Sequence, residues 1–180
     1  MINPYQSRLF VAGILYCLLF TPVLYADDWP TWRHDASRTA ATDQVLPDTL
    51  HLQWSRQLPP PKAAWPEDPR LMFDATYEPI VVGDFLYLAS AQTNGVTAYN
   101  TRTGEERWRY FTSGPVRFAP VYDSGKMYFG CDGGQLYCVD STTGKLNWKI
   151  DAAATSRKVI GNDRLISVWP IRGGPVIHDH

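Results

Sequence analysis

A repeat with a period of about 40 residues constrains the fold more than any other feature, because a fixed period of this size indicates an array of equal structural units. Residues 98–108 (AYNTRTGEERW) align with residues 138–148 (CVDSTTGKLNW), and each copy carries a Thr-Gly turn followed four residues later by a tryptophan. Gly104 aligns with Gly144, and Trp108 aligns with Trp148. A period of about 40–45 residues is that of a four-stranded β-propeller blade.

Short runs of aromatic and β-branched residues, separated by Gly, Asp and Asn, predict four strands in each copy. In the turn before the last strand, the side chain of Asp140 or Asn100 accepts a backbone hydrogen bond two residues on, and glycine tolerates a positive φ. We therefore predict an all-β chain with about two four-stranded antiparallel propeller blades plus partial strands. The expected strands are residues 79–82, 85–89, 96–99 and 105–110 in the first copy, and 120–122, 126–131, 135–139 and 145–150 in the second.

The repeated pattern, A-x-D-x-x-T-G-K-x-x-W, resembles the tryptophan-docking repeat of quinoprotein-like propellers. That family includes the pyrroloquinoline quinone (PQQ) dehydrogenases and the β-barrel assembly lipoprotein BamB. The second copy departs from the pattern at Cys138, and the first at Asn100 and Glu105. The Trp-rich segment 27–35 (DDWPTWRHD) is also similar to the N-terminal part of such exported proteins.

The resemblance implies that the repeated tryptophan packs one blade against the next, with the Thr-Gly turn beneath it. Burial of an indole is worth a few kcal/mol, so these residues are explained without any ligand. We interpret them as structural docking residues and not as a cofactor site. They are Trp108, Gly104, Trp148, Gly144 and Asp140.

Residues 1–26 are predicted to be a secretory signal peptide. A short segment with a positive charge at Arg8 precedes the apolar run 9–20 (LFVAGILYCLLF), and Ala26 provides a small residue at the expected cleavage site. The alternative is a membrane anchor, but the run is shorter than the ~20 apolar residues of a spanning helix. We therefore expect a periplasmic or extracellular protein that does not span the membrane after cleavage.

Composition and length set further limits. The chain has 180 residues, of which 44% are hydrophobic and 19% charged, and a formal net charge of −1, so it is neither disordered nor suited to bind nucleic acid. We divide the rest into an N-terminal segment with a ring-closing strand near Trp54 (27–57), a proline-rich loop (58–76) and a partial propeller (77–180). Because a ring needs at least four blades, we expect an N-terminal fragment of a longer propeller. The alternative is a small two-sheet domain.

The two cysteines after the predicted signal peptide are expected to be free and buried. If residues 132–135 form the hairpin loop, Cys131 faces Leu136 and Cys138 is its diagonal neighbour. Diagonal Cα atoms are about 7–8 Å apart, whereas a disulfide requires less than about 7 Å.

The second copy is followed by an insertion. The stretch from Trp148 to Pro175 is more than twice as long as the equivalent stretch from Trp108 to Pro120. Loops on a rigid β-scaffold frequently carry recognition sites, although mixed charges also occur on ordinary solvated surfaces. The candidate interaction residues in this loop are Arg157, Lys158, Arg164, Trp169 and Arg172.

Two functions are compatible with these features. The resemblance to BamB implies a non-catalytic exported scaffold that presents loops to protein partners. The alternative is a PQQ-dependent dehydrogenase that oxidises alcohols or sugars with PQQ and calcium. Many such dehydrogenases stack the cofactor on a disulfide of adjacent cysteines, and this sequence has no Cys-Cys pair. We therefore favour the scaffold and predict no cofactor, no catalytic residue and no metal ligand, with PQQ and calcium only under the alternative.

Overall fold

The computed structural model describes residues 27–63, 68, 76–161 and 163–178. The predicted signal peptide and most of the predicted proline-rich loop lie outside these residues. Within them, no helix is long and apolar enough to cross a membrane.

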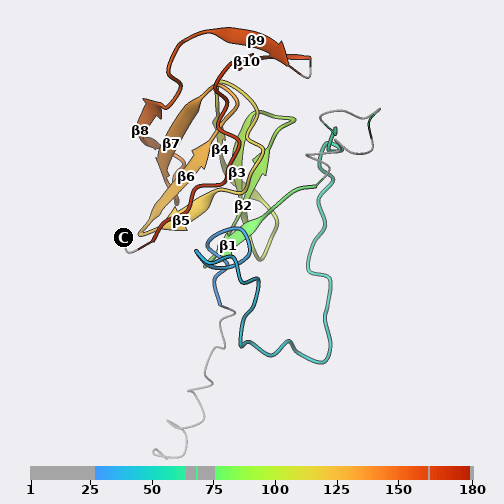
Figure 1. Cartoon of the computed structure of the whole chain (residues 1–180). Coiled ribbons are helices and arrows are strands. Elements are labelled where there is room, and N and C mark those ends of the chain that lie inside the picture. The colour runs from blue at the N-terminus through green and yellow to red at the C-terminus, as the bar shows by residue number, and fades with distance from the viewer. Residues whose placement is uncertain (1–26, 64–67, 69–75, 162, 179–180) are drawn as a thin grey trace, which may run out of the picture.

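Two four-stranded antiparallel sheets form the body of the molecule, each a simple meander (Figure 1). This arrangement confirms the predicted all-β fold with propeller-type blades. A separate two-stranded sheet follows the second blade. The first blade consists of β1 (Ile80–Val82), β2 (Phe85–Ser90), β3 (Gly95–Asn100) and β4 (Glu106–Phe111); the second of β5 (Val121–Asp123), β6 (Lys126–Gly130), β7 (Gln135–Asp140) and β8 (Leu146–Asp151); and the small sheet of β9 (Lys158–Gly161) and β10 (Arg164–Ser167).

The repeat in sequence is also a repeat in strand register. The pairing of β3 with β4 shifts between Ala98 and Tyr99, and the pairing of β7 with β8 shifts between Cys138 and Val139. These irregularities lie at equivalent positions of the two blades. A β-bulge increases local twist, so both outer strands bend in the same way relative to their blades.

The hydrophobic core lies between the two blades. Tyr110 of β4 contacts Phe129 and Tyr137 of the second blade edge-on, with ring centroids 6.0 and 5.5 Å apart. Met127 and Val116 are buried in the same cluster. The outermost strand β8, in contrast, is exposed along its whole length. Edge-to-face aromatic pairs add to the burial of these large side chains, which holds the two sheets face to face.

The N-terminal segment crosses the innermost strands of both blades. Trp29 exchanges two backbone hydrogen bonds with Val81 of β1, at 2.6 and 3.0 Å, and the carbonyl of Pro30 accepts one from Tyr122 of β5 at 2.8 Å. The Asp28 carboxylate accepts a further bond from the backbone N–H of Gly83. These contacts fix the segment across both sheets and satisfy backbone groups at the inner edges.

Both cysteines are free and buried, as predicted, but for a different geometric reason. The expectation that Cys131 faces Leu136 is wrong: Leu136 pairs with Gly130, and the backbone N–H of Cys131 bonds to the carbonyl of Gln135. Cys138 pairs with Tyr128, so the two cysteines lie on opposite faces of the sheet. Because the turn comprises residues 132–134 and not 132–135, the strand pairing is shifted by one residue relative to the prediction. This shift places the two thiols on opposite faces of the sheet.

Candidate functional site

Trp108 lies over the Thr-Gly turn of the second blade. Its indole N–H donates to the carbonyl of Ser141 at 2.8 Å, and only 8% of the residue is exposed. Gly144 has a φ of +69°, and a Cβ added there would come within 2.6 Å of the Trp108 ring. The same Ser141 carbonyl accepts a bond from Tyr87 at 3.2 Å, and burial raises the pKa of Tyr87 to about 12. The glycine is therefore required both by the backbone and by the indole packed on it.

Trp54 lies on the first blade in the same way, and sequence reasoning missed this contact. Its indole N–H donates to the carbonyl of Thr101 at 2.7 Å. Gly104 has a φ of +70°, and a Cβ there would come within 2.6 Å of the Trp54 ring. Residues 52–55, expected to be a ring-closing strand within segment 27–57, are not in a strand here, and their ring-closing role stays a prediction. The signal that was available is the likeness of the segment around Trp54 to that around Trp148, which identifies a docking tryptophan outside the regular repeat.

Trp148 differs from these two tryptophans. It is 40% exposed, and its ring packs beside Tyr128 of its own blade, with centroids 6.0 Å apart. No glycine turn lies beneath it in the described part of the chain. Its inter-blade docking role stays a prediction.

Asp140 organises the turn that receives Trp108. Its Oδ1 atom accepts hydrogen bonds from the hydroxyl of Thr143 at 2.7 Å and from its backbone N–H at 2.8 Å, and another from the N–H of Thr142. These bonds, the hydroxyl first, lower the pKa of Asp140. Asn100 accepts two equivalent backbone bonds in the first blade. Asp140 and Gly144 thus belong to one turn, and Trp108 is its packing partner.

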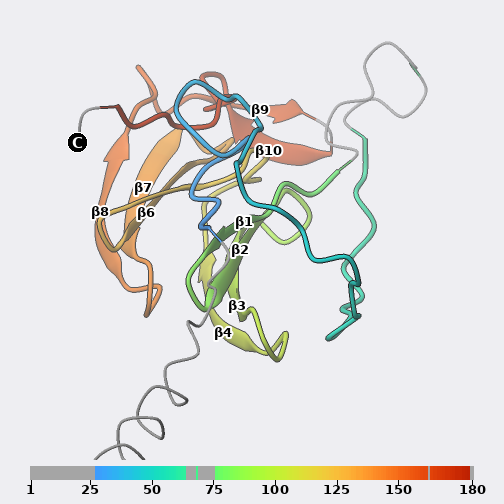
Figure 2. The ribbon, with the colours of Figure 1, turned by 90° about the horizontal axis from the view of Figure 1, so that it is seen from below.

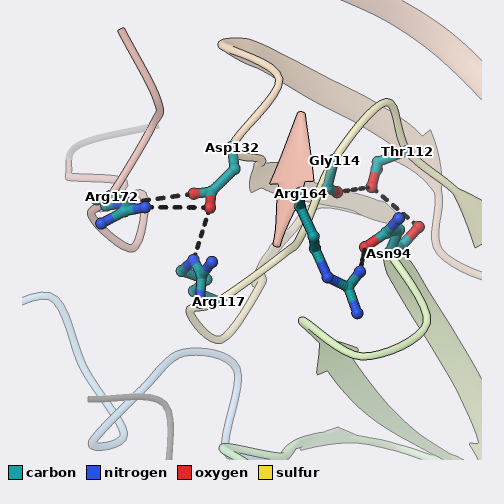
Figure 3. A network of polar contacts seen from close by, with 7 residues as sticks. All are labelled: Asn94, Thr112, Gly114, Arg117, Asp132, Arg164 and Arg172. Atoms are coloured by element: carbon teal, nitrogen blue, oxygen red, sulfur yellow. Dashed lines mark hydrogen bonds and ion pairs between the residues drawn. The ribbon is translucent and has the colours of Figure 1, made fainter. Parts of the chain in front are cut away.

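The β9–β10 hairpin of the insertion lies at one end of the two blades, against the β2–β3 and β6–β7 connections (Figures 1 and 2). We call this end the insertion end. Arg164 at the start of β10 donates to the Asn94 side chain at 2.5 Å and to the Gln92 carbonyl at 3.3 Å. Both acceptors belong to the β2–β3 connection, so this guanidinium holds the β9–β10 hairpin on the first blade (Figure 3).

A buried carboxylate holds the insertion on the second blade. Asp132 is fully buried, and its carboxylate bonds to Arg117 Nε at 2.7 Å and to Arg172 Nη2 at 3.3 Å (Figure 3). Its backbone carbonyl also accepts from the N–H of Ser167 at 2.8 Å. Since buried charges persist only when they are paired, this cluster gives the insertion a defined position.

The β9–β10 hairpin has two different faces, because side chains alternate along a strand. Arg164 and the buried Ile166 point to the blades. On the other face Ile160 and Leu165 stand directly opposite each other, 83% and 59% exposed. Trp169, just beyond β10, is also 59% exposed.

The five predicted interaction residues therefore fall into two groups. Arg164 and Arg172 bind the insertion to the blades, whereas Arg157, Lys158 and Trp169 are exposed. The sequence patterns did not identify the exposed pair Ile160 and Leu165 or the buried Asp132 as candidate site residues. The alternation of side chains within residues 158–161 and 164–167 is the sequence signal for the exposed pair Ile160 and Leu165. No local sequence feature distinguishes Asp132 from any other aspartate in a turn.

The described residues contain no group of three or more His, Cys, Asp or Glu side chains placed to hold a metal ion. The cysteines lie on opposite faces of one sheet, which does not resemble a platform of adjacent cysteines.

A family model described as outer membrane protein assembly factor BamB matches residues 31–168. Tetrathionate hydrolase from Acidithiobacillus ferrooxidans is 32% identical over 56 residues, which cover 31% of this chain and 11% of the hydrolase.

Two solved structures are similar to parts of this chain. Quinohemoprotein alcohol dehydrogenase from Comamonas testosteroni matches 76% of this chain and 21% of its own length, with 22% identity and a TM-score of 0.51. BamB from Moraxella catarrhalis matches 50% of this chain and 34% of its own, with 16% identity and a TM-score of 0.36. The chain thus spans about a tenth of the hydrolase and a fifth of the dehydrogenase. Because the family match extends over most of its length, this chain belongs to the BamB family of PQQ-type repeat propellers.

Proposed function

We propose that the protein is a non-catalytic propeller scaffold, exported to the periplasm or the cell exterior, that binds a protein partner at its insertion end. The observation that carries the proposal is the two-faced β9–β10 hairpin. Arg164 anchors the hairpin to the first blade and the backbone N–H of Ser167 anchors it to the second, whereas Ile160 and Leu165 are exposed opposite each other. The family description as an assembly factor and the signal-like sequence of residues 1–26 support the same function.

Physical considerations favour a partner on this surface. Clustered apolar side chains on a soluble protein mark interaction sites more often than single exposed ones do. Burial of apolar surface contributes about 25 cal/mol per Å², and Trp169 is of the type that dominates interface energies. Since the hairpin is already held in place, little ordering entropy is lost on binding.

Site-specific crosslinking tests the proposal. A photo-reactive amino acid at position 160 of the full-length protein, expressed in its own cells, is expected to form a discrete protein adduct. The adduct should disappear with Leu165→Glu and persist with the control Leu46→Glu, which changes another exposed leucine, on the N-terminal segment. An adduct that is insensitive to Leu165→Glu, or none at all, would refute the scaffold hypothesis.

The competing hypothesis, a PQQ-dependent dehydrogenase, predicts a different result. When PQQ and calcium are added to the full-length protein, the scaffold proposal expects neither bound quinone absorbance nor reduction of an electron-accepting dye with alcohols or sugars. Bound quinone together with alcohol-dependent dye reduction would replace the scaffold by the dehydrogenase.

A further inference from the structure

We propose that the outer edge of β9 (Lys158–Gly161) receives an extended segment of the protein partner, which adds to the β9–β10 sheet as a third strand. The segment carries apolar side chains and an acidic residue. This inference rests on the proposed scaffold function and specifies how the partner is bound.

The backbone of β9 leaves one edge open. The carbonyl of Arg157 accepts a bond from the N–H of Val168, and Val159 pairs with Ile166, so Arg157 and Val159 turn their backbone groups to the β10 side. In an antiparallel pair the alternate residues point the other way. Lys158 and Ile160 therefore direct an N–H and a C=O each away from the hairpin, and neither makes another backbone bond in the described part of the chain.

The opposite edge of the hairpin is different. On β10 the outward N–H of Ser167 bonds to the carbonyl of Asp132. The second blade thus occupies part of that edge, and β9 remains the accessible one.

The β9 edge also lacks most of the devices that protect free edges. Natural sheets block their edges with prolines, bulges or inward charges. Here the strand reads Lys-Val-Ile-Gly, with no proline or irregular pairing, and Lys158 is its one charge. Its β-branched residues favour extended pairing, and addition of a strand to such an edge is an established mode of peptide recognition.

Charge indicates what kind of segment fits. Arg157 and Lys158 are exposed and make no ion pair with any described residue, whereas Asp163 is paired with Lys62 at 2.9 Å and Asp151, which lines a cavity with Lys158, accepts a hydrogen bond from Gln135. The end of the edge at Lys158 is therefore positive. An incoming strand with a carboxylate there and an apolar residue over Ile160 complements both features.

The test uses two variants of one residue in the full-length protein. Ile160→Pro removes the outward N–H without touching a β9–β10 hydrogen bond, because Ile160 directs its backbone groups away from β10; proline is also tolerated at the edge of a sheet. Ile160→Ala removes the side chain and retains the N–H. The probe is an eight-residue peptide of alternating Val and Thr with Glu at both ends, so that either strand direction places a carboxylate near Lys158.

We expect the peptide to bind the parent protein and to slow hydrogen exchange of the Lys158 and Ile160 amides. Binding should weaken roughly tenfold more in Ile160→Pro than in Ile160→Ala, since lost backbone bonds add to the lost side chain. A peptide N-methylated on the pairing edge should not bind. This last arm leaves the protein unchanged and is independent of how the proline variant folds.

Three outcomes would overturn the inference. Equal affinity of the proline and alanine variants would mean that the edge is unused and only the apolar face binds, and the scaffold function would stand. If the N-methylated peptide binds as tightly as the unmethylated peptide, the edge is likewise unused and only the apolar face binds. Absence of peptide binding, with binding instead to vesicles of phosphatidylglycerol and phosphatidylcholine, would assign the surface to a lipid headgroup region and would also contradict the scaffold proposal.

Discussion

Trp108→Ala is expected to lower the free energy of unfolding of the full-length protein by about 3–5 kcal/mol, the range for truncation of large aromatic residues in cores. The indole is 8% exposed, bonds to the Ser141 carbonyl and packs on Gly144. Its removal leaves a cavity between the blades and takes away one of the two donors to that carbonyl. Chemical denaturation monitored by circular dichroism measures the loss.

The matched control is Trp169→Ala, which deletes the same side chain from a surface where it is 59% exposed. This variant should unfold like the parent, because most of its indole stays in water in both states. The docking interpretation is contradicted if Trp108→Ala costs no more than Trp169→Ala.

Asp132→Asn is expected to cost on the order of 3 kcal/mol, since removal of one partner from a buried ion pair leaves an uncompensated charge. The carboxylate is fully buried against the Arg117 side chain, which is 4% exposed, and Arg172 shares it. The asparagine keeps the shape of the side chain but not its charge. The variant should also increase hydrogen exchange at Ser167, because the anchor of the insertion is lost.

Asp163→Asn is the control for this prediction. Asp163 pairs with Lys62 in an exposed position, where the Lys62 ammonium lowers its pKa through a hydrogen bond and charge attraction. Exposed ion pairs contribute little to stability, so its melting temperature should match that of the parent. If both aspartate variants melt alike, the buried cluster is not an anchor.

Local chemistry in the sequence predicts most of the blade architecture. The predicted blade strands agree with the observed ones to within one or two residues, because alternation and turn residues act over short stretches of chain. Gly104 and Gly144 both adopt a positive φ, as the Thr-Gly turns require. The same local chemistry places Asp140 and Asn100 as acceptors for the backbone of their turns.

Local patterns failed where one residue changes a register. The sequence predicts Cys131 opposite Leu136, but the turn at residues 132–134 is one residue shorter than this prediction requires. A shift of one position moves a side chain to the other face of the sheet. Turn composition alone does not discriminate between these two loop lengths.

The sequence by itself determined a repeat of propeller blades, the turns that close their strands and the presence of an insertion. Tertiary structure alone decided that Trp54 packs on Gly104, that Asp132 meets Arg117 and Arg172, and that Arg164 faces the blades while Ile160 faces solvent. Each of these arrangements depends on segments that are far apart in the sequence, so no periodic pattern encodes it. These contacts depend on which surfaces the two packed sheets bring together. Burial then lets charged residues such as Asp132 and Arg117, which are usually exposed, hold the insertion in place.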